Sequence, residues 1–354
     1  MRIALVTVFS RFLIFCFWVF LIGVFLFIPR IYKYIHQDRS LTVFTWPLLL
    51  DPIYLKNFEK ETGIKLYITY FENGAALLSK MAATNGQGYD IILPDDHYLQ
   101  LLIKQNLVKK IDRTKLSFWN KLDPNLLGVY SDLDNLYSIP YYWGFYALGY
   151  NTNTYYNKTL PESWSVLFDN SFCPHARICM TDDPREAILI TAQYLFGTID
   201  ALKQTEAREK IKQELIRQKK FIEVYTISRA DILLQNNSCG LALIMSPELQ
   251  RLVRDYPMIQ SIIPQEGTFA IVDSIAIPIT TNKDEMIYQF LNYLYRPEVI
   301  HHHTSLYGYC SPLALEDSIK GDLCSMNQFS NFNFFKNSIP DDIINSLWIE
   351  VLAA

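Results

Sequence analysis

The feature that most restricts the fold is an alternation of strand-like and helix-like segments that begins near residue 40. Short runs rich in β-branched and aromatic residues cover 41–46, 64–71 and 89–94. Amphipathic helical spacing covers 52–62, 74–84 and 97–106. The alternation predicts a mainly parallel sheet with helices on its faces. Ligands of such sheets bind at the carboxyl ends of the strands, which here are Thr45–Trp46, Phe71–Glu72 and Pro94–Asp96.

The later part of the chain predicts a second lobe. Residues 131–150 are strand-like and aromatic, and we interpret them as a segment that crosses between lobes. A further α/β region extends to about residue 272, and a strand at 274–278 and a helix at 284–295 then predict a return to the first lobe. The roughly 325 residues after the leader exceed what one core usually organises, so two lobes are expected.

The first 28 residues predict that the remainder is exported. They contain Arg2, Arg11, no acidic residue, and an unbroken apolar run over 12–28. A run of about 17 residues is long for the core of a signal peptide and just long enough to span a bilayer. No small-x-small cleavage pattern follows. We expect 1–39 to be a signal anchor or a signal peptide, with the uncleaved anchor favoured.

The composition predicts a folded, mildly acidic protein. Half of the residues are hydrophobic and 19% are charged, so a large core can be buried. The net charge is −4, and the exported part is more negative because the leader contributes only arginines. This balance argues against nucleic acid as a partner and favours a cationic one.

Cysteine positions allow two small disulfide loops. In an oxidising compartment Cys173 can pair with Cys179, and Cys310 with Cys324, which leaves Cys239 over. No C-x-x-C pair is present, so neither a zinc site nor a thioredoxin-like site is indicated.

The sharpest local motif is Asp183-Pro-Arg-Glu186. Its structural interpretation is a capping box, in which an aspartate N-cap precedes proline at the first helical position and glutamate at the third. Two carboxylates at one helix start can also receive an ammonium group.

Two other polar clusters have structural explanations that we favour. Asp95, Asp96 and His97 fit a solvated loop better than a metal site, and His301–His303 fit an exposed loop run. The sequence contains no nucleophile elbow, P-loop, G-x-G-x-x-G or H-E-x-x-H motif. No catalytic residue, cofactor or metal is therefore predicted, and an enzyme is the weaker class.

The chain contains three motifs in a fixed order: S-I-P-Y-x-W-G at 138–144, T-D-D-x-R-E at 181–186 and D-S-x-A-I-P at 273–278. With these motifs and their surroundings, the sequence over about 41–315 resembles the spermidine/putrescine-binding proteins of bacterial ABC importers. The resemblance implies a type II periplasmic-binding-protein fold. Its two α/β lobes, each a mainly parallel sheet flanked by helices, close on a ligand in the cleft between them. It places 40–146 and 273–317 in the first lobe, and 147–272 and 318–354 in the second.

In that family, aromatic rings contact the methylenes of the polyamine and carboxylates meet its ammonium groups. The resemblance carries five of these positions over to this chain: Trp46, Asp183, Glu186, Asp273 and Tyr309.

Other positions depart from the family pattern. Leu48 and Leu49 replace a carboxylate and a ring, Met245 and Ile271 replace two tryptophans, and Lys336 falls where a neutral glutamine is expected. Asp95 and His97 replace a serine and a tyrosine, and Asp95 or Asp96 can restore the missing negative charge.

The resemblance thus implies a monomeric, periplasmic solute-binding protein, tethered to the inner membrane by 12–28, that delivers spermidine or putrescine to an ABC permease and its ATPase. It implies no enzymatic activity and no nucleic-acid partner. Two alternatives stay open at this point. One is another cargo, such as ferric iron or thiamine, and the other is a tethered sensor subunit that kept the fold and lost transport.

Overall fold

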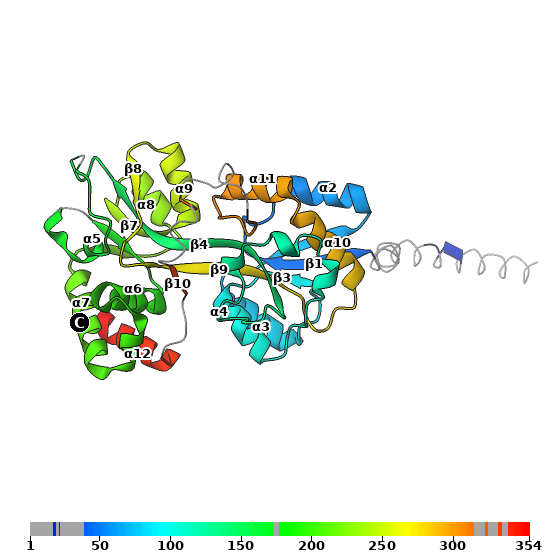
Figure 1. Ribbon diagram of the computed structural model, residues 1–354, viewed down its shortest axis with the longest axis horizontal. Helices are drawn as coiled ribbons and strands as arrows, with labels where there is room; N and C mark the ends of the chain where they lie inside the picture. Colours follow the sequence, from blue (N-terminus) through cyan, green and yellow to red (C-terminus); the bar gives the residue numbers. More distant parts are fainter. Residues whose placement is uncertain are drawn as a thin grey trace, which may run out of the picture.

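The computed structural model describes residues 17, 18, 21, 39–156, 158–172, 177–314, 323–324, 332–334 and 339–354. Apart from Phe17, Trp18 and Leu21, the anchor predicted at 12–28 lies outside these residues, as do Cys173 and Lys336. None of the helices in these ranges has the length and apolar character needed to cross a membrane. The molecule is elongated, with two bodies joined by two long strands (Figure 1).

The first body is built from the predicted β-α-β units. Its strands are β1 (Ser40–Thr45), β2 (Lys65–Tyr70) and β3 (Ile91–Ile92), and its helices are α2 (Pro52–Thr62), α3 (Gly74–Thr84), α4 (Asp96–Lys104), α10 (Asp284–Leu294) and α11 (Pro297–Tyr307). The strand β1 pairs in parallel with both β2 and β3. Apolar side chains from these elements form two buried clusters, one of which contains Leu41, Phe58 and Phe290.

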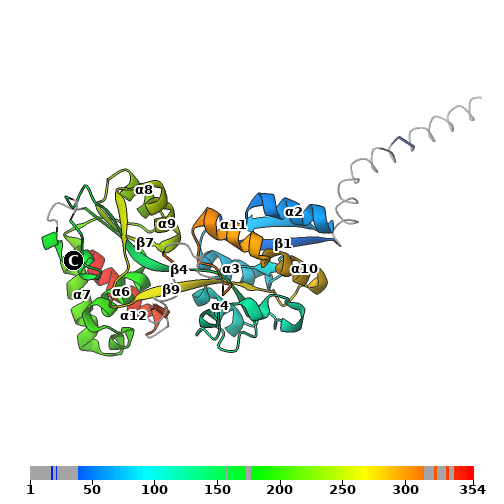
Figure 2. The same cartoon turned by 45° about the horizontal axis from the view of Figure 1, so that its top comes forward.

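Two antiparallel strands connect the bodies. The strand β4 (Ser138–Asn151) pairs with β9 (Thr268–Ala276) over its first part, as far as Phe145 opposite Ala270. From Tyr146 onward it pairs with β7, and from Leu148 onward with β8 as well. Every residue of β4 is buried, and the strand covers 138–150 of the segment predicted to cross between the bodies, whereas 131–137 are not strand. Figure 2 shows β4 and β9 side by side between the two bodies.

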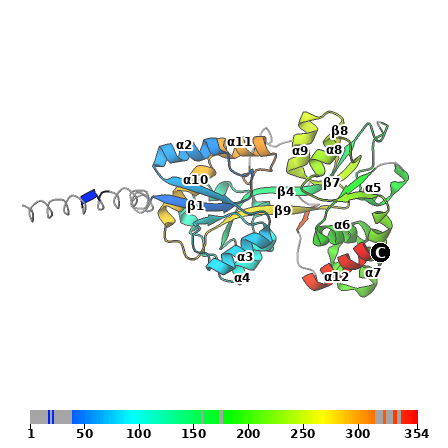
Figure 3. The same cartoon turned by 180° about the vertical axis from the view of Figure 1, so that it is seen from behind.

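The second body continues the same sheet in the order β2-β1-β3-β9-β4-β7-β5-β6. Its strands are β5 (Ile178–Met180), β6 (Ile222–Tyr225), β7 (Leu241–Met245) and β8 (Ile259–Ile262), and β10 (Phe332–Phe334) pairs with β9. Its helices are α5 (Ser165–Phe168), α6 (Pro184–Phe196), α7 (Thr205–Lys219), α8 (Ala230–Gln235), α9 (Ser246–Asp255) and α12 (Asp341–Ala353). The last helix packs against α6 and α7 (Figure 3).

Two sequence-based interpretations are wrong. His301–His303 do not form an exposed loop, because they lie inside α11 and His303 is fully buried. The ring of His303 accepts a hydrogen bond from the backbone N–H of Asp51, at 2.9 Å, which explains its place in the core. Asp95 and Asp96 do not lie in a solvated loop either, since they begin helix α4 and Asp96 is only 2% exposed.

One of the two cysteine pairs expected from the sequence is present. Cys310 and Cys324 form a disulfide with their Cα atoms 5.5 Å apart. Cys179 is a free, buried thiol next to the free thiol of Cys239, and its expected partner Cys173 lies outside the described residues.

Candidate ligand-binding cleft

A cavity of about 250 Å³ lies where the two bodies meet. Its walls come from the starts of α4 and α6, from β9 and from α12, and they comprise Asp95–Tyr98, Asp183–Glu186, Ile271, Asp341, Ile344 and Asn345. Four of the seven predicted site residues, Asp95, Asp96, Asp183 and Glu186, therefore meet in one cavity, and they come from both bodies.

The start of α6 holds its two carboxylates by different means. Asp183 is the N-cap, and its Oδ1 accepts hydrogen bonds from the N–H of Arg185 and the N–H of Glu186, at 2.8 and 3.0 Å. The reciprocal half of the predicted capping box is absent, because the N–H of Asp183 donates to Thr181 Oγ1. Glu186 instead accepts from Thr181 at 2.5 Å and from the hydroxyl of Tyr146. Its carboxylate is thereby fixed at the cavity wall.

The start of α4 supplies the carboxylates of the first body. Asp95 is the N-cap, with Oδ1 accepting from the N–H of Tyr98 at 2.9 Å. Asp96 is the first helical residue, and its carboxyl group lies close to the hydroxyl of Tyr130, although neither its buried Oδ2 nor that hydroxyl makes a well-aligned hydrogen bond among the described residues. A buried carboxyl oxygen without a well-aligned donor is costly, so either a small shift of Tyr130 or a ligand group that donates hydrogen bonds would stabilise it.

The remaining predicted residues lie beside this cavity rather than in its wall. Asp273 is on β9 opposite Tyr142 of β4, and Tyr309 stacks on the ring of Tyr142, with centroids 5.4 Å apart. The indole N–H of Trp46 is close enough to Asp273 to lower the pKa of that carboxyl, although it makes no well-aligned hydrogen bond. Trp46, Asp273 and Tyr309 thus form a second group next to the first.

Burial and mutual repulsion raise the pKa values of the carboxyl groups. Burial is the larger cause in each case: it raises the pKa of Asp95 to about 6, of Glu186 to about 8 and of Asp273 to about 8, and it raises the pKa of Asp96 well above its usual value. Neighbouring carboxylates add to each shift, because ionising one acid next to another is unfavourable.

Cationic side chains do not neutralise this group of acids. Among the described residues of the cavity wall, Arg185 is the one with a permanently cationic side chain. It forms an ion pair with Asp341 of α12. Burial, followed by the charge of Arg185, lowers the pKa of His97, so its imidazole is neutral at neutral pH. The cavity therefore has an excess of acidic groups, whose ionised forms a ligand cation can stabilise.

The residues that differ from the family pattern lie at different places in the structure. Leu49 is fully buried in the first body and cannot line the cleft, whereas Leu48 is 65% exposed with a positive φ of 59°. Ile271 does line the cavity. Among the described residues, no group of three or more His, Cys, Asp or Glu side chains is arranged to hold a metal ion.

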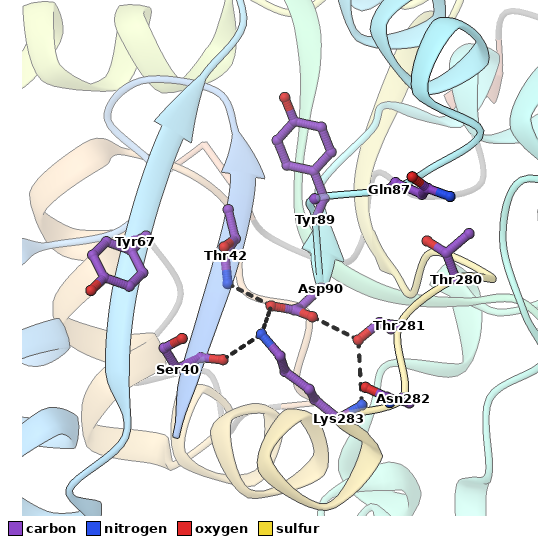
Figure 4. Close-up of a pocket in the computed structure, with 11 residues that line it drawn as sticks. Ser40, Thr42, Tyr67, Gln87, Tyr89, Asp90, Thr280, Thr281, Asn282 and Lys283 are labelled. Atoms are coloured by element: carbon purple, nitrogen blue, oxygen red, sulfur yellow. Dashed lines mark hydrogen bonds and ion pairs between the residues drawn. The ribbon is translucent and has the colours of Figure 1, made fainter. Parts of the chain in front are cut away.

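A larger cavity, of about 390 Å³, lies at the opposite ends of the first-body strands. Figure 4 shows that its central carboxylate, Asp90, is already surrounded by donors. It accepts from the N–H of Thr42 at 2.8 Å, from Thr281 at 2.6 Å and from the ammonium of Lys283 at 3.0 Å. The central charges of this cavity are therefore paired with each other. The cavity also lies at the amino ends of β1 and β3, where ligands of parallel sheets are not expected.

Comparison with known proteins agrees with this fold. Residues 54–320 match the family model of the bacterial extracellular solute-binding proteins. The chain belongs to this family. A spermidine/putrescine-binding periplasmic protein of Salmonella typhimurium is 26% identical over 279 residues, which is 78% of each chain. A putrescine-binding periplasmic protein of Escherichia coli is 26% identical over 281 residues, which is 75% of this chain and 76% of that protein.

Solved structures of solute-binding proteins have the same architecture. A putative spermidine/putrescine ABC transporter protein from Listeria monocytogenes superposes with a TM-score of 0.75 at 25% identity, covering 89% of this chain and 98% of its own. A spermidine/putrescine ABC transporter substrate-binding protein of Streptococcus pneumoniae gives 0.79 at 21% identity, covering 89% and 99%. The two-lobed fold expected from the resemblance is confirmed.

Sequence reasoning missed two acidic residues, namely Asp341 of α12 in the cavity wall and Glu248, which lies in the first turn of α9. Its carboxylate raises the pKa of Asp273 and of Tyr309, after burial and other neighbours, so it lies near the second group of site residues. In the sequence, Ser246-Pro247-Glu248 has a small polar residue followed by proline, as Asp183-Pro184 does. This helix-start pattern was the available signal for an acidic residue at a second helix start.

Proposed function

We propose that this protein is the solute-binding component of an ABC importer and that it captures a polyamine in the cleft between its two bodies. The observation that carries the proposal is the gathering of four carboxyl groups from both bodies in one cavity, of which that of Asp96 is buried, without a free cationic side chain among the described residues of its wall. A linear polycation supplies the missing positive charges and the missing donors to Asp96. The two relatives described above, a spermidine/putrescine-binding and a putrescine-binding protein, support the same ligand class.

The proposal assigns Trp46, Asp95, Asp96, Asp183, Glu186, Asp273 and Tyr309 to ligand binding. The first lobe comprises 40–146 and 273–317, and the second comprises 147–272 and 318–354. Closure of these lobes around the ligand is the signal to an inner-membrane permease and its ATPase. The protein acts in the periplasm as a monomer, with residues 12–28 as its tether, and it has neither a catalytic role nor a nucleic-acid partner.

Calorimetric titration tests this function directly. The full chain in detergent, refolded from denaturant to remove carried-over ligand, is titrated with putrescine, spermidine, thiamine and ferric citrate. We expect saturable one-to-one binding of a polyamine. A Glu186→Gln variant should bind it more weakly, whereas Glu209→Gln, at an exposed position of α7, should bind it as the wild type does. Binding of thiamine or ferric citrate alone would replace the polyamine with another cargo, and silence toward all four would favour a sensor subunit.

A further inference from the structure

Tyr130 lies in the segment 127–137 that leads into β4, and none of the three sequence motifs includes it. It is not part of the cavity wall, whereas Asp96 is. The buried hydroxyl of Tyr130 nevertheless lies close to the carboxyl group of Asp96 at the start of α4. This contact joins a residue of the cavity wall to a residue outside that wall.

The segment that carries Tyr130 is fixed in place. The side chain of Asp132, which is only 7% exposed, accepts hydrogen bonds from the N–H of Leu136 and the N–H of Tyr137, at 3.0 and 2.8 Å. The side-chain amide of Gln100 in α4 donates to the backbone carbonyl of Tyr130 at 3.4 Å. The fold itself therefore holds this tyrosine against the helix that begins in the cavity.

A purely structural role does not account for the hydroxyl of Tyr130. Buried tyrosines usually pair their hydroxyl groups, as Tyr295 does by donating to the carbonyl of Pro140 at 2.6 Å. The hydroxyl of Tyr130 and Oδ2 of Asp96 are both buried without a well-aligned partner among the described residues. A phenylalanine would fill the same space without the cost of an unpaired hydroxyl. The hydroxyl is therefore suited to a state in which it is paired.

The surroundings of Asp96 favour a neutral donor at this place. Burial, followed by the nearby acids Asp95 and Asp273, raises the pKa of Asp96. A lysine or arginine here would relieve that burden, but its charge would also repel a cationic ligand. A hydroxyl donates a hydrogen bond without adding charge. Because a carboxyl oxygen can accept two hydrogen bonds, the ligand can approach the same group from the cavity.

We propose that Tyr130 is a positioning residue for the ligand. When the ligand binds, the hydroxyl of Tyr130 donates a hydrogen bond to Oδ2 of Asp96, and an ammonium group of the polyamine donates to the same carboxyl group from the cavity. The tyrosine thus orients Asp96 without contacting the ligand itself. This inference rests on the proposed polyamine function.

The test compares Tyr130→Phe with the wild type in calorimetric titrations of the full chain with putrescine and with spermidine. We expect the Kd of each amine that the wild type binds to rise about fivefold, as for the loss of one hydrogen bond. Thermal melts without ligand should show no fall in Tm, because the lost hydroxyl is unpaired in that state. Tyr295→Phe is the matched control: it removes a paired hydroxyl, so it should lower the Tm and leave the Kd unchanged.

A second pair of variants tests whether Tyr130 acts through Asp96. In an Asp96→Ala background, adding Tyr130→Phe should change the Kd less than about twofold, because the group that the hydroxyl orients is gone. A full fivefold loss in that background would overturn the assignment.

Three other results of Tyr130→Phe would also overturn the assignment and leave the polyamine function intact. These are an unchanged Kd, a fall in Tm as large as that of Tyr295→Phe, and a failure to fold, which would show that the hydroxyl is structural. If the wild type binds neither amine, the proposed function and this inference fail together.

Discussion

Polyamine binding should tighten as the pH rises from 6 to 8, and it should release protons. Burial first, and neighbouring carboxylates next, raise the pKa of Glu186 to about 8 and the pKa of Asp273 to about 8. Both carboxyl groups are therefore mostly protonated at pH 7 in the ligand-free protein. An ammonium group beside them favours their ionised forms, so their pKa values fall on binding and protons leave.

The size of this effect follows from the same pKa values. At pH 7, ionising one carboxyl group with a pKa of about 8 costs about 1.4 kcal/mol, which corresponds to about tenfold in Kd. Each group that ionises on binding therefore strengthens binding about tenfold per pH unit, until the pH reaches its ligand-free pKa. Two such groups give up to about a hundredfold per unit between pH 6 and 8, and the affinity levels off above pH 8.

Calorimetry in two buffers measures the released protons. The apparent binding enthalpy at pH 7 is compared in phosphate and in Tris, whose ionisation enthalpies differ, while the amines stay charged because their pKa values are close to that of lysine. We expect between one and two protons to be released by the wild type, and about one fewer by Asp273→Asn. A buffer-independent enthalpy, together with a constant Kd from pH 6 to 8, would show that the carboxylates are already ionised and that the reasoning is wrong.

Three further predictions concern affinity and stability. Glu186→Ala and Asp273→Ala should each weaken diamine binding by on the order of 1–3 kcal/mol, more than Tyr309→Phe, which keeps its ring; equal affinities of all three variants in calorimetry would contradict this. The free energy of unfolding of the ligand-free protein should fall as the pH rises, because the folded state favours the protonated forms of Glu186 and Asp273. This contribution to stability is complete below the unfolded-state pKa values of about 4. It is lost as the pH rises through the folded-state values of about 8. Thermal melts without ligand between pH 5 and 8.5 check the sign, and a Tm that stays constant or rises would refute it. Replacing Cys310 and Cys324 with serine should lower the free energy of unfolding by about 3 kcal/mol, because their disulfide closes a segment with a sequence separation of 14; an unchanged denaturation midpoint would count against this.

Local signals were sufficient for much of the fold. Helix α2 has the predicted bounds because Asp51 caps its first turn, Pro52 begins it, and Gly63 ends it with a φ of 70°. Helix α3 likewise runs between Asn73 and Asn85, both of which satisfy backbone groups at its ends. Short elements such as β5 and β6 were not identified, because a strand of three or four residues carries too little periodicity to be recognised.

The site was harder to predict because it depends on distant parts of the chain. The family pattern supplied Asp183 and Glu186, and the structure places them in one cavity with Asp95 and Asp96. The sequence could not show that Asp96 is buried, since its neighbours in the sequence are polar. Nor could it show that Glu248 approaches Tyr309, because the contact comes from two helices that belong to different bodies.

The change of pairing partner along β4 has a mechanical consequence. In the strand pairing, β4 is opposite β9 as far as Phe145 and opposite β7 from Tyr146 onward. A rotation of one body against the other would have to bend both β4 and β9, because these two strands connect the bodies. Tyr146 is also the residue whose hydroxyl holds the carboxylate of Glu186. A strand that connects the two bodies therefore also carries a side chain that holds an acid of the candidate site, so a change in the angle between the bodies would shift the position of that acid.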